Sequence, residues 1–76
     1  VRFVYSNPEN IAGSIDIFDY AMDKVIQLNN SHLVDNESEV IWNGRNEYGD
    51  QVANGVYFCR LSLNGKYNWT KLAVVN

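Results

Sequence analysis

Residues 55–75, "GVYFCRLSLNGKYNWTKLAVV", consist of two apolar runs on either side of the dipeptide Asn64-Gly65. Asn-Gly between two such runs predicts a tight β-hairpin, because a type I′ turn requires a positive φ at both of its central residues. We therefore expect antiparallel strands over residues 55–63 and 66–75.

Alternation along this hairpin divides its side chains between two faces. The more apolar face is expected to point into the core, and it consists of Tyr57, Cys59, Leu61, Leu63, Leu72 and Val74. The reverse face mixes aromatic, polar and charged residues: Phe58, Arg60, Ser62, Tyr67, Trp69 and Lys71. A cysteine inside an apolar strand pattern is expected to be a buried, inert thiol.

Upstream of the hairpin, short apolar runs of period two alternate with clusters of Asn, Gly and Asp. These runs predict strands over residues 2–5, 13–19, 23–28 and 39–42, with a turn at 20–22. The polar residues 29–38 are interpreted as a loop between two sheets, with a short edge strand at Leu33 and Val34. Six or seven short strands with frequent turn signals predict an all-β fold, an antiparallel β-sandwich.

Composition limits the possible functions. The chain has 76 residues, of which 46% are hydrophobic and 13% aromatic, and this is enough for one small core. Its net charge of −3 and the lack of a basic run argue against a nucleic-acid partner. No apolar run approaches the roughly 18 residues of a membrane span, and the first residues do not resemble a signal peptide. The start without Met predicts a single module cut from a longer polypeptide.

Residues 42–57 carry the spacing W-N-G-R-x-x-x-G-x-x-V-x-x-G-x-Y. Gly44 and Gly49 permit positive φ, and the side chains of Asn43, Asn46 and Asp50 are expected to bond to nearby backbone groups. The side chain of Val52, the apolar residue of this segment, is expected to lie beneath the loop. The spacing therefore has a conformational explanation.

The oxygen atoms of Asn43, Asn46, Glu47 and Asp50 are also of the kind that Ca²⁺ prefers. Their spacing is not that of an EF-hand, and turn formation explains them without a metal. We predict no metal and no cofactor, although metal binding by residues 29–38 or 43–50 stays open.

The 42–61 segment resembles the Ig-like domain shared by the flagellar hook-capping protein and by many C-terminal modules of secreted bacterial proteins. That family shows W-[DN]-G-[RK], then Gly, an apolar residue and G-x-Y. The matching residues are Trp42, Asn43, Gly44, Arg45, Gly49, Val52, Gly55, Tyr57 and Leu61. "SIDIFDYAMDKV" is similar to the family's I-Y-D-x-x-G-x-x-V segment, with Met22 in place of the usual Gly. The resemblance implies an Ig-like β-sandwich of six to seven strands.

The C-terminal hairpin also resembles the sorting domain of type IX secretion cargo, in which G-x-Y is followed by a Gly turn and a Lys before a terminal apolar strand. Gly55, Tyr57, Gly65, Lys71, Leu72 and Val74 match this pattern. The resemblance implies a non-catalytic sorting or attachment domain of a secreted or cell-surface protein that passes the periplasm and outer membrane. Its partner would be the secretion machinery or a neighbouring domain.

The candidate recognition hairpin thus contains Gly65, Tyr67, Trp69, Lys71, Leu72 and Val74. Two other roles stay open. The hook-capping resemblance also fits an assembly scaffold. Tyr67 and Trp69, two residues apart on one strand face, fit a carbohydrate-binding platform as well as packing against another protein domain.

No catalytic constellation is predicted, so the chain is not expected to be an enzyme. His32 lies in a polar segment far from Cys59 in the sequence. The acidic residues Asp16 and Asp19, like Glu37 and Glu39, are expected on solvent-facing positions.

Overall fold

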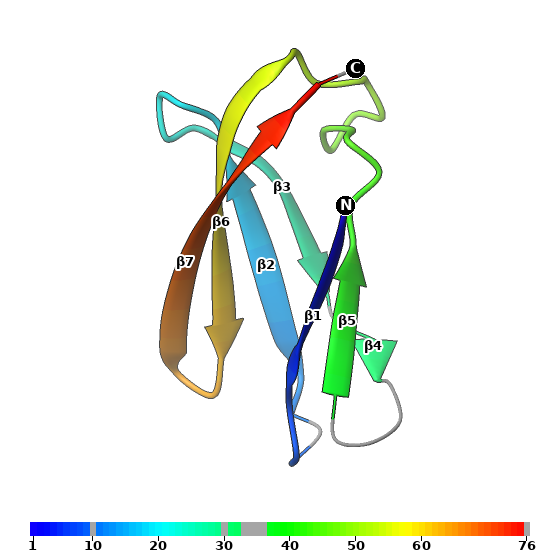
Figure 1. Ribbon diagram of the computed structural model, residues 1–76, viewed down its shortest axis with the longest axis vertical. Helices are drawn as coiled ribbons and strands as arrows, with labels where there is room; N and C mark the ends of the chain where they lie inside the picture. The colour runs from blue at the N-terminus through cyan, green and yellow to red at the C-terminus, as the bar shows by residue number, and fades with distance from the viewer. Residues whose placement is uncertain (10, 30, 33–36, 76) are drawn as a thin grey trace.

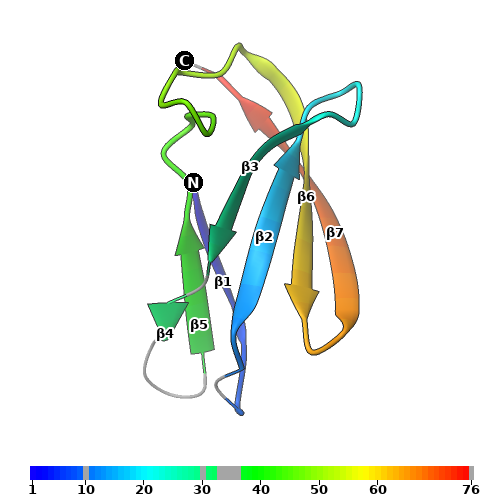
Figure 2. The same cartoon turned by 180° about the vertical axis from the view of Figure 1, so that it is seen from behind.

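The computed structural model describes residues 1–9, 11–29, 31–32 and 37–75, which form strands and turns with no helix (Figures 1 and 2). The strands are β1 (Arg2–Ser6), β2 (Gly13–Phe18), β3 (Lys24–Asn29), β4 (Ser31–His32), β5 (Glu37–Ile41), β6 (Gly55–Leu63) and β7 (Lys66–Val74). They build a three-stranded sheet of order β1-β5-β4 and a four-stranded sheet of order β3-β2-β6-β7. The predicted all-β sandwich is confirmed.

All strand pairs are antiparallel, and their order corresponds to that of an immunoglobulin domain. In that fold, strands A, B, E and D form one sheet and strands C, F and G form the other. Here β1, β5 and β4 take the places of B, E and D, whereas β2, β6 and β7 take those of C, F and G. The strand β3 extends the second sheet beside β2. No described strand occupies the place of A, next to β1.

The β6–β7 hairpin forms as predicted. Asn64 and Gly65 have φ values of 52° and 75°, and Leu63 pairs with Lys66 directly beside the turn. The register continues without a shift to the pair Gly55 and Val74. The local turn chemistry therefore determines the alignment of both long strands.

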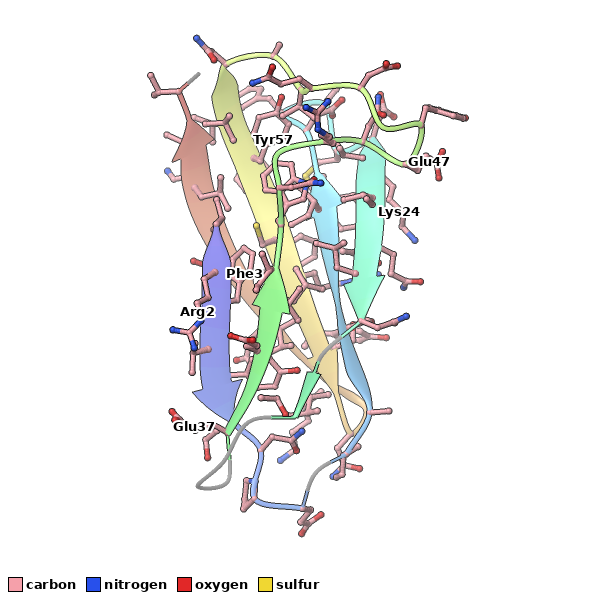
Figure 3. All side chains as sticks on the ribbon, turned by 90° about the vertical axis from the view of Figure 1, so that its right-hand side faces the viewer. Arg2, Phe3, Lys24, Glu37, Glu47 and Tyr57 are labelled. Atoms are coloured by element: carbon pink, nitrogen blue, oxygen red, sulfur yellow. The ribbon has the colours of Figure 1, made fainter. Side chains whose placement is uncertain are left out.

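The core lies between the two sheets. Its buried side chains are Ile15, Ile17, Val40, Trp42, Val52, Tyr57, Cys59 and Val74, with Leu61 and Leu72 partly buried against them. These positions confirm the predicted inward face of the hairpin, whereas Leu63 is only half-buried near the turn. Phe3 of β1 packs against this core, whereas the neighbouring Arg2 is exposed; both residues are labelled in Figure 3.

Trp42 anchors the chain where it leaves β5. Its side chain is 1% exposed, its Nε1 donates to the Arg45 carbonyl at 2.9 Å, and its ring meets that of Tyr57 edge-on at 5.6 Å. The Tyr57 hydroxyl in turn donates to the Ala53 carbonyl at 2.6 Å. Both ends of the 43–54 loop are thereby tied to one aromatic pair.

The 43–54 loop is held by its own side chains and backbone. The Asn43 side chain accepts from the Arg45 amide, and the Asn46 side chain accepts from the amides of Tyr48 and Asp50. Gly44 and Gly49 have φ values of 77° and 86°. The Val52 amide donates to the Gly44 carbonyl, and its side chain is buried beneath the loop. The expected conformational role is confirmed for Gly44, Gly49, Val52 and the side chains of Asn43 and Asn46, whereas Asp50 takes part through its backbone.

The predicted start of the fifth strand is wrong. β5 begins at Glu37, two residues before the predicted 39–42 strand, and β4 falls inside the segment interpreted as a loop. The polar composition of this stretch suggested a loop, but pairing with β1 extends the strand as far as the pair Ser6 and Glu37. The edge strand expected at Leu33 and Val34 lies outside the described residues.

A buried polar pair fixes the connection between β1 and β2. Asn7 is 2% exposed, and its Nδ2 donates to the Ile11 carbonyl at 2.8 Å and to the Ser38 hydroxyl at 2.9 Å. Its Oδ1 accepts from the Ile11 amide at 3.1 Å. One side chain therefore closes the loop after β1 and ties it to β5.

Candidate functional site

The outer face of the four-stranded sheet carries a cluster of aromatic residues around one arginine. We call it the aromatic face and define it as Phe18, Tyr20, Phe58, Arg60, Tyr67 and Trp69. Tyr20, Tyr67 and Trp69 are 77%, 63% and 52% exposed. Phe18 contacts Trp69 at 5.6 Å between ring centroids, and Tyr20 contacts Phe58 at 6.1 Å. Such exposed large rings on neighbouring strands form a continuous surface.

Arg60 lies at the centre of the aromatic face. Its guanidinium carbon is 5.4 Å from the ring centroid of Phe18, 5.0 Å from that of Tyr67 and 5.7 Å from that of Trp69. Contacts within about 6 Å are favourable cation–π interactions. The arginine therefore holds rings from β2 and β7 in one arrangement.

The alternation of the strands brings these groups together. Asp16 on β2 pairs with Arg60 on β6, and Arg60 pairs with Trp69 on β7. On the other side, Asp16 pairs with Gln27 of β3. The outward side chains of four strands thus form one cross-strand row, which places a carboxylate next to the central arginine.

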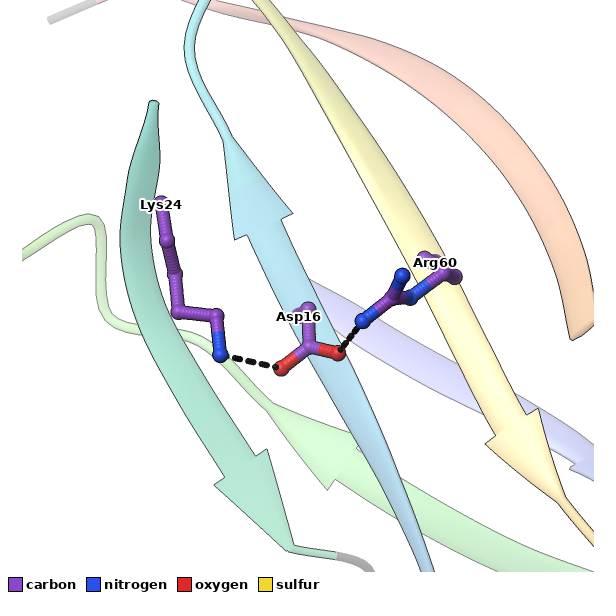
Figure 4. Close-up of polar contacts among 3 residues, drawn as sticks. All are labelled: Asp16, Lys24 and Arg60. Carbon is purple, nitrogen blue, oxygen red and sulfur yellow. Dashed lines mark hydrogen bonds and ion pairs between the residues drawn. The ribbon is translucent and has the colours of Figure 1, made fainter. Parts of the chain in front are cut away.

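Asp16 is buried beneath this surface, although a solvent-facing position was expected. It is 1% exposed, and its Oδ2 accepts from Arg60 Nη2 at 2.7 Å while its Oδ1 lies 3.5 Å from Lys24 Nζ (Figure 4). The expectation is wrong because the long side chains of Lys24 and Arg60, on the flanking strands, cover the short carboxylate. Two-residue alternation assigns a side chain to a face but does not reveal whether neighbouring side chains cover it.

The charge of Asp16 is stabilised by these cations. Burial by itself raises the pKa of the carboxyl group, but the hydrogen bond from Arg60 and the positive charge of Lys24 outweigh it. The pKa of Asp16 therefore lies below its usual value, and the group is ionised at neutral pH. An ionised Asp16 keeps Arg60 oriented beneath the aromatic rings.

The predicted recognition hairpin is divided between the two faces of the sheet. Gly65 lies in the turn, and Tyr67, Trp69 and Lys71 are exposed on the outer side. Leu72 is half-buried and Val74 is buried, and both belong to the core. Only the outer set is available to a partner without opening the sandwich.

The aromatic face includes residues that the sequence did not single out as a site. Phe18 and Tyr20 come from β2 and the turn after it, 51 and 49 positions away from Trp69 in the sequence. Alternation with the buried Ile17 places Phe18 on the outward face of β2. The pairing of β2 with β6 brings Phe18 next to the hairpin, and no local sequence signal predicts this pairing.

The residues of the 42–57 spacing that carry the family resemblance do not belong to the aromatic face. Trp42, Val52 and Tyr57 are buried, and Arg45 Nη1 donates to the Gly49 carbonyl at 2.9 Å within the 43–54 loop. These residues shape the loop between β5 and β6. They form contacts with one another that explain their spacing.

The titratable groups of the described residues do not gather into a metal-binding cluster of three or more His, Cys, Asp and Glu. Cys59 is 1% exposed, and burial raises the pKa of its thiol to about 11. The thiol is therefore protonated at neutral pH, as expected for an inert core cysteine. Within the described ranges, no helix has the length and apolar character that a membrane crossing requires.

The sequence matches no protein-family model, and comparisons with curated proteins and with solved structures return no similar protein. The class of the chain therefore rests on its own strand order and packing, which are those of a small antiparallel β-sandwich.

Proposed function

We propose that this chain is a non-catalytic recognition module that binds another protein through the aromatic face. The observation that carries the proposal is the arginine-centred cluster of exposed rings described above. Tyr, Trp and Arg are the residue types that dominate binding energy at protein interfaces. Exposed apolar patches on small domains commonly mark interaction sites.

Preorganisation supports this function. Arg60 bonds to the buried Asp16 and contacts three rings, so these side chains are ordered before a partner arrives. A surface that is already ordered loses less conformational entropy on binding. Lys71, which pairs with Phe58 across the hairpin, adds an exposed cation beside the same surface.

The resemblance to type IX sorting domains supports a specific form of the proposal. In this form, the module directs a larger bacterial protein through the outer membrane, and a component of the secretion machinery binds the outer face of the terminal hairpin. The parent protein would then be secreted or held at the cell surface.

A reporter fusion tests the sorting role. Residues 1–76 are fused behind a signal peptide and a fluorescent protein in a bacterium with type IX secretion. We expect the reporter at the cell surface or in the medium, and we expect the double variant Trp69→Ala/Lys71→Ala to be exported less. The matched control is Tyr48→Ala, because Tyr48 is 80% exposed but lies in the 43–54 loop.

Two results would contradict the sorting role. One is retention of the fusion in the periplasm to the same extent as a reporter without the domain. The other is equal export of the double variant and the wild type when both are folded by circular dichroism. If export fails, capture of a purified periplasmic or outer-membrane protein that depends on Trp69 would still support protein recognition.

Carbohydrate binding is a second candidate, favoured by the exposure of Tyr67 and Trp69 on one strand face. It ranks second because Arg60 lies against both rings, where a sugar would stack. Pull-down with insoluble polysaccharides tests it. Retention that is lost in Trp69→Ala and kept in Tyr48→Ala would support a sugar platform, whereas no retention of the wild type would exclude the polysaccharides used.

A further inference from the structure

The outer edge of β1 carries backbone groups that no described strand pairs. Val1 and Trp42 exchange both backbone hydrogen bonds, each at 2.8 Å, next to the β1–β5 ladder. Such pairs alternate along an antiparallel ladder, so Phe3 and Tyr5 also direct their backbone groups toward β5. The N–H and C=O groups of Arg2, Val4 and Ser6 consequently point away from the sheet.

An apolar groove lies beside this edge. It has a volume of about 360 Å³, and β1 forms one wall while β7 forms the other. Ile15 and Cys59, which are 2% and 1% exposed, contribute to its lining at the level of the core. The lining that the argument uses is Phe3, Ile15, Cys59, Leu61, Asn68 and Thr70. The sandwich is therefore less completely closed between β1 and β7 than over its centre.

We propose that the groove binds an extended peptide segment of a partner protein, which adds to β1 as a fourth strand. The free backbone groups of Arg2, Val4 and Ser6 would bond to the segment, and every second side chain of the segment would enter the groove. The occupant is thus a strand with apolar residues at alternate positions. Addition of a strand to an open sheet edge is a general mode of peptide recognition.

The walls of the groove favour a single strand over a second copy of the domain. A strand bonded to β1 has β7 on its other side, because Asn68, Trp69 and Thr70 line the opposite wall. The inner face of β1 in a second copy is covered by that copy's own four-stranded sheet. That sheet would have to occupy the space of β7, so symmetric pairing of two β1 edges is sterically blocked.

The position of the groove agrees with the strand order. In an immunoglobulin domain, strand A lies next to strand B, and β1 takes the place of B. Figure 1 shows β7 and β1 as the edge strands of their two sheets, with β7 at the far left of the view. The peptide would therefore occupy a position that this architecture already accommodates.

Selection from a peptide library tests the proposal. A phage-displayed library of random nine-residue peptides is selected on the 76-residue domain, and binding of the selected peptides is measured by fluorescence anisotropy. We expect peptides with apolar residues at every second position. We also expect Val4→Pro to weaken their binding by at least about tenfold, because proline removes an outward N–H and blocks the edge.

Two further variants define the site. Thr70→Arg places a long charged side chain at the β7 wall, on an exposed position, and should weaken binding by a similar factor. Tyr48→Ala changes an exposed aromatic residue of the 43–54 loop that does not line the groove, so it should bind as the wild type does. If Val4→Pro does not fold, Thr70→Arg decides whether the selected peptides bind in the groove.

The proposal is overturned if no peptide is selected, if the selected peptides lack the alternation, or if folded Thr70→Arg binds them like the wild type. It is also overturned if sedimentation shows a wild-type dimer that Val4→Pro dissociates, since a second copy would then occupy the edge. Trp69 belongs to both surfaces, but Val4→Pro and Thr70→Arg change only the groove, whereas the reporter fusion measures export through the aromatic face.

Discussion

At the scale of single residues, the most unusual backbone conformation is that of Met22. Its φ is 65°, and among the described residues Asn64 is the only other non-glycine with a positive φ. The Met22 amide donates to the Asp19 carbonyl, and the Asp19 amide donates to the Asp23 carbonyl, which closes the turn between β2 and β3. A side chain resists this conformation by roughly 1–2 kcal/mol, and glycine does not.

We expect Met22→Gly to raise the free energy of unfolding by about 0.5–1 kcal/mol, because relief of the backbone strain exceeds the added entropy of the unfolded chain. Urea denaturation measures the change. The matched control is Ala21→Gly in the same turn, where no positive φ is present and glycine should destabilise by a similar amount. Equal destabilisation by both variants would contradict the explanation.

Asp16 is the residue at which charge and burial conflict most strongly. Asp16→Asn keeps the shape but removes the negative charge that faces Arg60 and Lys24. We expect this variant to lower the free energy of unfolding by about 2 kcal/mol at pH 7. The loss is moderate because the Arg60 guanidinium is partly exposed, so water can solvate it when the carboxylate is absent.

The effect of Asp16→Asn should depend on pH. The pKa of Asp16 is lowered in the folded state, so its contribution is fully present above the unfolded value of about 3.9 and is lost as the pH falls through the folded value. The difference between wild type and variant should therefore shrink below about pH 4. Asp50→Asn, at an exposed loop position, is the control and should change little. A deficit that is the same at pH 3 and pH 7 would refute the assignment.

At the scale of secondary-structure elements, the strands differ in how well they could be predicted. The β6–β7 hairpin followed from Asn64-Gly65 and from period-two alternation, both of which are local. The start of β5 was missed because Glu37 and Ser38 are polar, and their strand conformation depends on pairing with β1. Ser38 is fully buried and accepts from Asn7, a contact across 31 positions of the sequence.

Asn7 should be essential for the connection between β1 and β2. We expect Asn7→Ala to destabilise the domain by about 1–3 kcal/mol, since it leaves the buried Ser38 hydroxyl and the Ile11 carbonyl without this donor. Hydrogen exchange should also speed up at the Ile11 amide, which donates to the Asn7 side chain.

The control for Asn7 is Asn68→Ala, an exposed asparagine in β7. It should change the free energy of unfolding by less than about 0.5 kcal/mol. Unchanged exchange at the Ile11 amide in Asn7→Ala would show that the connection is held in another way.

At the scale of the whole molecule, the sandwich has one small core with Cys59 near its middle. A domain of this size has a free energy of unfolding of roughly 5 kcal/mol. Cys59 is 1% exposed and burial raises the pKa of its thiol to about 11. A reagent therefore reaches the thiol poorly, and little of the reactive thiolate is present at neutral pH. The reactivity of Cys59 therefore reports the opening of the core.

We expect a thiol reagent to label native Cys59 at least about 1,000-fold more slowly than the urea-unfolded chain at pH 7, and the rate to rise with urea in parallel with unfolding. The positive control is Cys59→Ser/Thr70→Cys, in which the thiol is exposed and should react at once. Fast labelling of the native wild type would show that the groove between β1 and β7 admits the reagent to the core.

The sequence by itself determined the strand-forming segments other than β4 and the start of β5, together with the hairpin register and the inward face of β6 and β7, because two-residue alternation and turn chemistry act between near neighbours. It also determined the turns of the 43–54 loop, where most hydrogen bonds are local, whereas the bond from the Glu47 amide to the Val25 carbonyl of β3 is not. Only the tertiary structure decided that Asp16 is buried, that Phe18 and Tyr20 join the hairpin rings, and that a groove remains between β1 and β7. These features arise from pairing between β2 and β6 and from the packing of the two sheets, which depend on contacts between segments far apart in the chain.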